Sequence, residues 1–227
     1  MKKTILACLL VAGTAFAQQI IGITSFSSDT VGDFPKGWRN WPGFGDKVHE
    51  VYRVKEEGGN KFLSADDSKD YSGQIFRGPA WYIKDHPLVT WRWRAQALPP
   101  GANESSGATN DSACGVYIMF SQFRQYGIKY VWSSTLPVGT IHAKIPGKMY
   151  FIVLDSGKSN VGKWRSHTVN ILEDYKKAFG SEPPSDLQSQ GIGILTDGNA
   201  VHARAACDYD DFARMKVKTP DAAPATK

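Results

Sequence analysis

Short apolar stretches alternate with turn residues along most of this chain of 227 residues. The stretches are rich in Val, Ile, Tyr, Phe and Trp, and residues such as Gly, Pro, Asn and Asp separate them, as at Pro99–Gly101 and Asp197–Asn199. This pattern is typical of β-strands joined by turns. The strands that it predicts are Val48–Val54, Lys61–Ala65, Gly73–Arg77, Leu88–Ala95, Cys114–Gln122, Ile128–Ser133, Gly139–Ala143, Tyr150–Asp155, Arg165–Ile171, Gly191–Thr196 and Ala203–Val217.

One segment follows a helical pattern instead. Leu172–Phe179 carries acidic residues in its first turn and lysines towards its end, which suits the dipole of a helix. Gly180 is placed to end this helix, and Pro183 and Pro184 block its continuation. A single short helix among about eleven strands predicts an all-β fold, either an antiparallel β-sandwich or a jelly roll.

The N-terminal segment has the features of a secretory signal peptide. Lys2 and Lys3 precede the apolar stretch Ile5–Ala12, and Ala15–Ala17 has the small residues of a cleavage site. Cleavage there predicts a mature chain that begins at residue 18 and is periplasmic or secreted. Two alternatives stay open, lipid attachment at Cys8 and a retained anchor, although the apolar stretch is shorter than the about 20 residues that span a bilayer.

The rest of the chain predicts one folded domain over residues 18–217, because β-sandwiches of about 200–250 residues often form a single domain. Residues 218–227 consist largely of Pro, Ala, Thr and Lys and predict a disordered tail. Without Lys2 and Lys3 the chain has 25 basic and 22 acidic residues, a net charge of +3. This excess is too small to predict binding to nucleic acid or to an anionic membrane. No later segment is apolar enough to predict a membrane span.

Two cysteines, Cys114 and Cys207, remain after removal of the signal peptide. Disulfides persist in the oxidising compartments to which exported proteins are sent. A Cys114–Cys207 bridge would close a loop of about 90 residues and contribute about 3–4 kcal/mol in the chain-entropy model. Two buried free thiols are the alternative, because the sequence does not determine whether the two Cα atoms come within bridging distance.

The strand Leu88–Ala95 has the most distinctive pattern of side chains. Successive side chains of a strand point to opposite faces, so Trp91 and Trp93 share one face while Arg92 and Arg94 share the other. The tryptophans then belong to the core, and the arginines are solvated or paired with carboxylates on a neighbouring strand. Alternatively, the two arginines line a sheet face and bind a polar or acidic ligand, for which the guanidinium fork is suited.

Further aromatic residues and one acid complete the candidate ligand contacts. Tyr130 and Trp132 share one face of the strand Ile128–Ser133, where aromatic rings can stack on a sugar and also donate a hydrogen bond. An ordinary hydrophobic core is the alternative. The aromatic loop Gly37–Phe44 predicts either a ligand platform or a plug at an open end of the sandwich. Asp111 follows the longest irregular loop, and long loops on a rigid sheet often carry functional residues.

The sequence contains no convincing catalytic or cofactor motif, so no cofactor is expected. The five histidines are well separated and lack the local spacing of a metal site. A structural Ca²⁺ site is an alternative, because oxygen ligands of the kind that Ca²⁺ prefers gather near the last strand, although they lack the spacing of an EF-hand. These residues are Asp197, Asn199, Asp208, Asp210 and Asp211. A glycoside hydrolase needs two carboxylates across a cleft. The sequence does not choose among the candidates for such a pair, which are Glu50, Asp111, Asp155 and Asp174.

Several segments occur in the order seen in one bacterial exported family. They are Trp91–Arg94, Leu98–Gly101, Val116–Phe120, Lys129–Ser133, Asp174–Tyr175 with Ala178–Gly180, and Gly191–Asp197. Over roughly Phe26 to Val217 the chain resembles the family called domain of unknown function 3047. The resemblance implies export and a galactose-binding-like or lectin-like β-sandwich, and it implies no activity. Relatives often carry paired acids before the Val116 strand, whereas here Ser112 follows Asp111, which weakens any acid–base or metal role at that position.

The leading hypothesis from the sequence is an exported, non-catalytic protein that binds a carbohydrate or another cell-envelope ligand. It rests on the predicted compartment, on the aromatic and arginine strands and on analogy between folds. The predicted contact residues are Arg92, Arg94, Asp111, Tyr130 and Trp132. Two alternatives stay open, a hydrolase or lyase that acts on a polysaccharide with a carboxylate pair, and an envelope scaffold that binds a protein partner.

Overall fold

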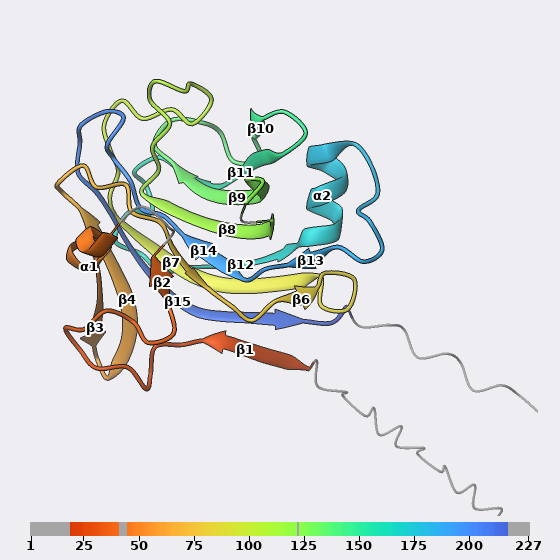
Figure 1. Ribbon diagram of the computed structural model, residues 1–227. Coiled ribbons are helices and arrows are strands. Elements are labelled where there is room, and N and C mark those ends of the chain that lie inside the picture. Colours follow the sequence, from red (N-terminus) through yellow and green to blue (C-terminus); the bar gives the residue numbers. More distant parts are fainter. Residues whose placement is uncertain (1–18, 41–44, 122, 218–227) are drawn as a thin grey trace, which may run out of the picture.

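Two β-sheets stacked face to face form the body of the protein in a computed structural model (Figure 1). The structure describes residues 19–40, 45–121 and 123–217. The predicted signal peptide, the predicted tail and the part of the aromatic loop at Trp41–Phe44 lie outside the described residues. In the described part of the chain, no helix is long and apolar enough to cross a membrane.

One sheet has six strands, and every pair in it is antiparallel. Its central strand is β15 (Ala205–Met215), which pairs with β7 (Leu88–Ala97) along one side. On its other side, β15 pairs first with β4 and then with β1. The bounds of the other four strands are β1 (Ile20–Thr24), β3 (Tyr52–Glu57), β4 (Asn60–Asp67) and β12 (Arg165–Asn170), with β3 and β12 at the edges.

The second sheet has seven strands in the order β10-β11-β9-β8-β14-β5-β2. Only β9 and β11 run parallel among its paired strands in the described residues. The bounds are β2 (Arg39–Asn40), β5 (Ile75–Arg77), β8 (Cys114–Ser121), β9 (Tyr126–Ser133), β10 (Ile141–Ile145), β11 (Met149–Ser156) and β14 (Ile192–Ile194). A separate two-stranded ladder pairs β6 (Trp81–Tyr82) with β13 (Gln188–Ser189).

The predicted helix is confirmed as α2 (Ile171–Phe179), which lies at one end of the sandwich (Figure 1). Asn170 caps it, because its side-chain oxygen accepts hydrogen bonds from the backbone N–H groups of Leu172 and Glu173. Gly180 ends it in the left-handed conformation at φ 72°. The prediction of a strand over Val48–Val54 is wrong in its first part. A one-turn helix, α1 (Val48–Val51), follows a 3₁₀ turn at Gly45–Lys47, and β3 begins only at Tyr52.

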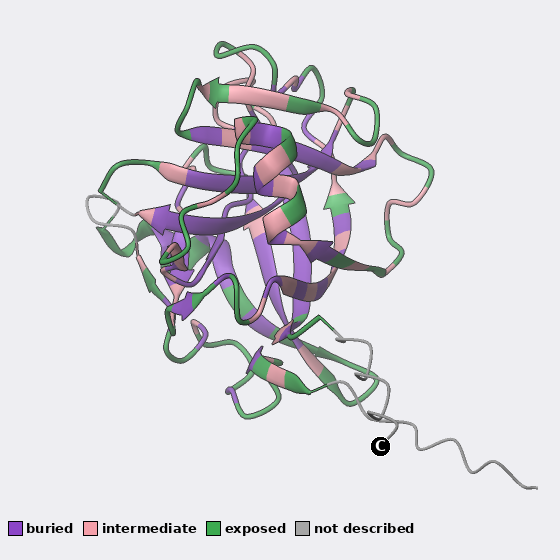
Figure 2. Cartoon of the chain, turned by 90° about the vertical axis from the view of Figure 1, so that its right-hand side faces the viewer, coloured by how far each residue is buried: buried purple, intermediate pink, exposed green. Residues whose placement is uncertain are grey.

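The core fills the space between the two sheets, where buried residues line the facing strands (Figure 2). Trp91 and Trp93 project into it from β7, as the alternation along that strand predicts. Cys114 on β8 and Cys207 on β15 form a disulfide with a Cα–Cα distance of 5.4 Å. The bridge therefore joins the two sheets through the core, and the predicted antiparallel β-sandwich with one short helix is confirmed, α1 being a single additional turn.

Candidate ligand-binding face

Arg92 and Arg94 lie on the face of the six-stranded sheet that points away from the core. They alternate along β7 with the fully buried Trp91 and Trp93, and their side chains are 26% and 13% exposed. The opposing strand β15 presents Asp210 directly across from Arg92 and Asp208 across from Arg94. The strand register therefore brings each guanidinium next to a carboxylate.

Each arginine is held by two carboxylates. Arg92 contacts Asp210 through Nη2 at 2.6 Å and Asp211 through Nε at 2.9 Å. Arg94 contacts Asp208 through Nη2 at 2.9 Å and Glu57 through Nη1 at 2.8 Å. Burial raises the pKa of Asp210, and hydrogen bonds from Asn60 and Arg92 oppose that effect. The pairing of both arginines with carboxylates of a neighbouring strand, one of the two interpretations of the sequence, is observed.

The indole of Trp164 lies against both guanidinium groups. Its ring is 4.7 Å from the guanidinium carbon of Arg92 and 4.8 Å from that of Arg94. Its ring also packs edge-on against Phe62 of β4 at a centroid distance of 5.5 Å. Cation–π contacts of this kind favour a fixed orientation of each guanidinium. We call the set Arg92, Arg94, Trp164, Asp208, Asp210 and Asp211 the arginine face.

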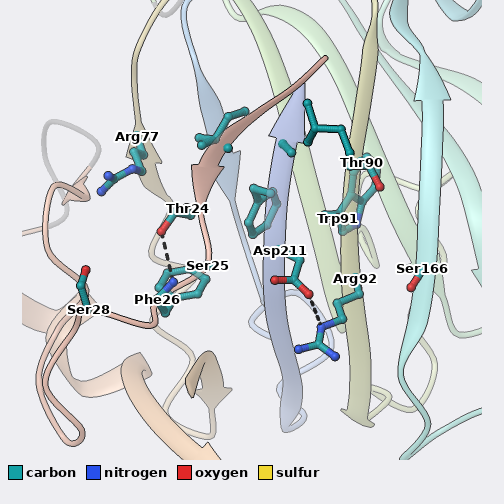
Figure 3. Close-up of a pocket in the computed structure, with 15 residues that line it drawn as sticks. Thr24, Ser25, Phe26, Ser28, Arg77, Thr90, Trp91, Arg92, Ser166 and Asp211 are labelled. Carbon is teal, nitrogen blue, oxygen red and sulfur yellow. Dashed lines mark hydrogen bonds and ion pairs between the residues drawn. The ribbon is translucent and has the colours of Figure 1, made fainter. Parts of the chain in front are cut away.

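A groove of about 680 Å³ begins at Arg92 (Figure 3). One wall is β1 with the turn that follows it, and the other is formed by β7 and β12. Figure 3 shows the carboxylate of Asp211 and the guanidinium of Arg92 in contact within it. Hydroxyl side chains line both walls, and they are Thr24, Ser25, Ser28, Thr90 and Ser166.

The backbone along this groove is unusual at two positions. Phe26 and Asp211 both have left-handed conformations, with φ values of 54° and 55°. This region is disfavoured for residues other than glycine, and such conformations are concentrated at functional sites. Asp211 lies at a β-bulge, because the register with β7 shifts between Asp210 and Ala213. The bulge adds one residue and leaves the carboxylate of Asp211 exposed beside Arg92.

A second hollow of about 630 Å³ lies on the same sheet face beside Arg94. Asp208 forms part of it and accepts hydrogen bonds from Arg94 Nε at 3.0 Å and from Gln96 Nε2 at 2.6 Å. Arg204 and Asp66 close one side with an exposed ion pair at 2.7 Å. The arginine face therefore has a hollow next to each of its two arginines.

The other predicted contact residues lie elsewhere. Tyr130 and Trp132 are completely buried in the core, where the Tyr130 hydroxyl donates to Asp174 and the Trp132 indole N–H donates to the Gly157 carbonyl. Asp111 is also completely buried, and one of its oxygens accepts from the Val201 N–H at 2.9 Å. Of the five predicted residues, the fold brings together Arg92 and Arg94 on one surface.

Sequence reasoning missed the aromatic and acidic members of the arginine face. Trp164 lies outside any strand, so no alternation of side chains placed it against β7. In the sequence, Asp210 and Asp211 are predicted only as possible calcium ligands, and nothing local pairs them with Arg92. A bulge cannot be recognised from the alternation of side chains, because the added residue breaks it. Trp38, from the aromatic loop, is buried and packs against Phe26 and Phe212 at centroid distances of 6.2 Å, as a plug would.

The remaining candidate acids serve structural contacts. Burial by itself raises the pKa of Asp155, but hydrogen bonds from His167 and Trp93 outweigh it and lower that pKa. Burial raises the pKa of Asp174, which accepts from Tyr130. Among the described residues, no group of three or more His, Cys, Asp or Glu side chains is arranged to hold a metal ion.

The sequence as a whole matches one protein family. The family model is described as a protein of unknown function, DUF3047, and it matches residues 36–213. The chain belongs to this family. The resemblance seen in the sequence is thereby confirmed. No curated protein matches the chain in sequence.

Solved structures similar to this DUF3047 member share little sequence with it. A mutant of a family 29 carbohydrate-binding module has 8% identity and a TM-score of 0.39, covering 88% of this chain and 93% of that one. Endoglucanase 3 of family GH12 from Trichoderma harzianum has 10% identity and a TM-score of 0.43, covering 88% and 98%. The K3 adhesin domain of Lys-gingipain from Porphyromonas gingivalis has 10% identity and a TM-score of 0.38, covering 84% and 95%. At these values none of the three informs the function of this chain.

Proposed function

We propose that the protein is exported and binds an uncharged, hydroxyl-rich ligand, such as a neutral glycan of the cell envelope, along the arginine face. The observation that carries this proposal is the groove beside Arg92, where a fixed arginine–carboxylate pair lies between two hydroxyl-lined walls. Binding without catalysis is the simplest use of such a surface.

The charge arrangement favours a neutral ligand. Arg77 and Arg92 bring two positive charges to the groove, and Asp210 and Asp211 beside Arg92 bring two negative ones, so the groove offers oriented donors and acceptors with little net charge. Sugar hydroxyl groups both donate and accept, and hydrogen bonds to charged partners are stronger than those between neutral groups. The second hollow beside Arg94 offers the same kind of pairing with Asp208 and Glu57. A polymer with repeated hydroxyl groups suits two such hollows on one sheet face.

Export is supported by two independent features. The N-terminal sequence has the charge, apolar stretch and small residues of a signal peptide. The Cys114–Cys207 disulfide suits an oxidising compartment outside the cytoplasm. Signal cleavage after Ala17 can be checked by N-terminal sequencing of the protein recovered from the periplasm or medium.

Binding at the arginine face predicts that Arg92→Ala and Trp164→Ala each weaken glycan affinity about tenfold or more, because each removes part of the fixed guanidinium arrangement. A panel of neutral oligosaccharides and a peptidoglycan pull-down would identify the ligand, and calorimetry would compare the variants. Lys163→Ala, at an exposed position next to Trp164, is the matched control and should bind as the wild type does.

If no glycan binds, or if Arg92→Ala and Trp164→Ala bind as tightly as the control, the proposal fails. Steady release of reducing ends from a polysaccharide would instead indicate the hydrolase alternative.

A further inference from the structure

A further cavity, of about 280 Å³, is separate from the groove and the hollow of the arginine face. It lies on the opposite side of the molecule, on the outer face of the seven-stranded sheet. Alternate residues of β8, β9 and β11 form its floor, while their neighbours point into the core. Tyr117, Met119, Met149 and Leu195 form an apolar cluster there that is separate from the main core. The cavity shares no residue with the arginine face.

A buried lysine lies in this apolar floor. Lys129 is 4% exposed, and its Nζ is 3.9 Å from Asp197 Oδ1 and 3.4 Å from Ser112 Oγ. Burial alone lowers the pKa of Lys129, but nearby Tyr117, Asp197 and Glu104 outweigh it and raise that pKa, so the amine stays charged. An ammonium group has three N–H donors. Two long contacts leave it able to donate a shorter hydrogen bond to a ligand.

A glycine beside Lys129 leaves room for the lysine side chain to lie along the surface of the sheet. Gly115, on the neighbouring strand β8, has no side chain above it, and a Cβ atom there would come within 2.6 Å of Lys129 Cε and 2.8 Å of the Leu195 carbonyl oxygen. Such approaches are far shorter than van der Waals contact. The glycine therefore keeps the space through which the lysine reaches Asp197.

Two more donors line the same cavity. Lys144 on the edge strand β10 contributes a second amine, and its pKa is lowered by burial and by the charge of Lys129. Gln74 Nε2 is buried and has no hydrogen-bond partner. An unpaired buried donor is costly and is usually satisfied by a water or a ligand. Three donors thus surround one space above an apolar floor.

The acids of this region are mostly occupied by other donors. Asp197 lines the cavity and accepts from the Ser112 N–H at 3.3 Å and from Ser72 Oγ at 3.4 Å. Glu104 lies in an adjoining hollow of about 380 Å³ and accepts from the hydroxyls of Ser112 and Ser133. Within the cavity itself, two lysines face one aspartate, so a single negative charge on a ligand would balance the lining.

We propose that this cavity binds a small carboxylate whose carbon skeleton is apolar on one face. The carboxylate lies between Lys129, Lys144 and Gln74 Nε2, and the skeleton packs on Tyr117, Met119 and Leu195. The same chemistry has two sources, a free organic acid or the uronic acid unit of a glycan. The site is independent of the glycan groove proposed on the other sheet.

Titration calorimetry with matched probes tests this site. Sodium glucuronate is compared with glucose, and sodium hexanoate with hexanamide, so each pair differs in charge and shares its skeleton. At least one carboxylate should bind with a Kd of about 1 mM or lower and about tenfold more tightly than its uncharged match. Glucuronate alone would indicate the uronic acid source, and hexanoate alone the free acid. Equal binding within both pairs, or no binding by either carboxylate, overturns the proposal.

Substitutions distinguish binding in the cavity from a general attraction of carboxylates to lysines on the protein surface. Lys144→Ala and Gln74→Glu should each weaken carboxylate binding about tenfold, the first by removing a donor and the second by placing a like charge beside the ligand. Lys148→Ala changes an exposed lysine in the turn between β10 and β11 and is the control, which should bind normally. Lys144 lies on the edge strand β10 with its side chain at the mouth of the cavity and outside the core, so its loss should leave the thermal unfolding temperature nearly unchanged. Normal binding by a folded Lys144→Ala protein overturns the proposal.

The outcome is distinguishable from that of the glycan proposal. Arg92→Ala and Trp164→Ala lie on the other sheet and should leave carboxylate affinity unchanged, while Lys144→Ala should leave glycan affinity unchanged. A loss of carboxylate binding in Arg92→Ala would contradict two separate sites.

Lowering the pH from 7.5 to 5.5 adds a further readout. Burial raises the pKa of Asp197 to about 6, so this group is largely neutral at pH 5.5 and repels a ligand carboxylate less. The charged or titratable groups around it are Lys129, Lys144, Asp111, Tyr117, Tyr52 and Tyr209, with Glu104 and His142 in the adjoining hollow. We expect carboxylate affinity to rise as the pH falls. A fall in affinity over this range would contradict a ligand carboxylate beside Asp197.

Discussion

At the scale of single residues, burial sets the chemistry of this protein more than residue type does. Asp197 is 5% exposed, and its distance of 3.9 Å from Lys129 is too long for a hydrogen bond. The loss of water therefore outweighs the attraction of the lysine, and the pKa of Asp197 rises to about 6. Asp211 directly follows the completely buried Asp210 but keeps an exposed carboxylate beside Arg92.

The raised pKa of Asp197 predicts a pH-dependent cost to stability. The folded protein holds the Asp197 proton more tightly than the unfolded chain, whose pKa is about 3.9. The stabilising contribution is present below about pH 4 and is lost as the pH rises through 6. Relative to Asp197→Asn, the wild type should therefore lose up to about 3 kcal/mol of unfolding free energy between pH 4 and 7.

Urea unfolding of the wild type and Asp197→Asn at several pH values measures this difference. Asp186→Asn removes one carboxylate from an exposed loop and serves as the matched control. A constant difference for Asp197→Asn across the range would show that this group does not titrate as inferred.

At the scale of elements, some features are determined by local sequence signals and others by the register between strands. The helix α2 depends on signals within the chain, because Asn170 supplies the cap and Gly180 the left-handed end. The arginine face depends on the register between β7 and β15, which no local signal specifies. The same strand alternation that places Arg92 outward places Trp91 inward.

Removing the cap of α2 should lower stability by a small, defined amount. Asn170→Ala removes the acceptor for the Leu172 and Glu173 N–H groups and should cost about 1 kcal/mol of unfolding free energy. Asn170→Asp keeps an acceptor at the same position and should remain close to the wild type. Chemical unfolding measures both, and an equal loss in the two variants would rule out capping as the cause.

At the scale of the whole molecule, the disulfide joins the two sheets through the core. Cys114 and Cys207 are separated by 93 positions in the sequence and come from the central parts of different sheets. The bridge therefore restricts the unfolded chain over a long loop. The two surfaces inferred to bind ligands lie on opposite outer faces of the sandwich that it holds together.

The double variant Cys114→Ala with Cys207→Ala should lose about 4.6 kcal/mol of unfolding free energy in the chain-entropy model for a loop of this length. Urea unfolding of the oxidised wild type and the double variant measures the loss. Treatment with a reductant should destabilise the wild type and leave the double variant unchanged. A reductant effect of similar size on both proteins would contradict this role for the bridge.

The sequence alone determined the features that depend on neighbouring residues. Apolar stretches with turn residues between them fixed the β class, and the charges and terminal glycine fixed the helix at Leu172–Phe179. Alternation along β7 separated the tryptophans from the arginines, because successive side chains of a strand must point to opposite faces.

Tertiary structure decided which face of each strand is buried in the core and which lies on the surface. Tyr130 and Trp132 share a face by alternation, but only the stacking of the two sheets turns that face into the core and leaves Lys129 on the other side. The Cys114–Cys207 pairing, the position of Trp164 over both arginines and the approach of Lys129 to Asp197 join residues far apart in the chain. Such contacts depend on register, bulges and sheet packing, which are properties of pairs of strands, and no single stretch of sequence contains them.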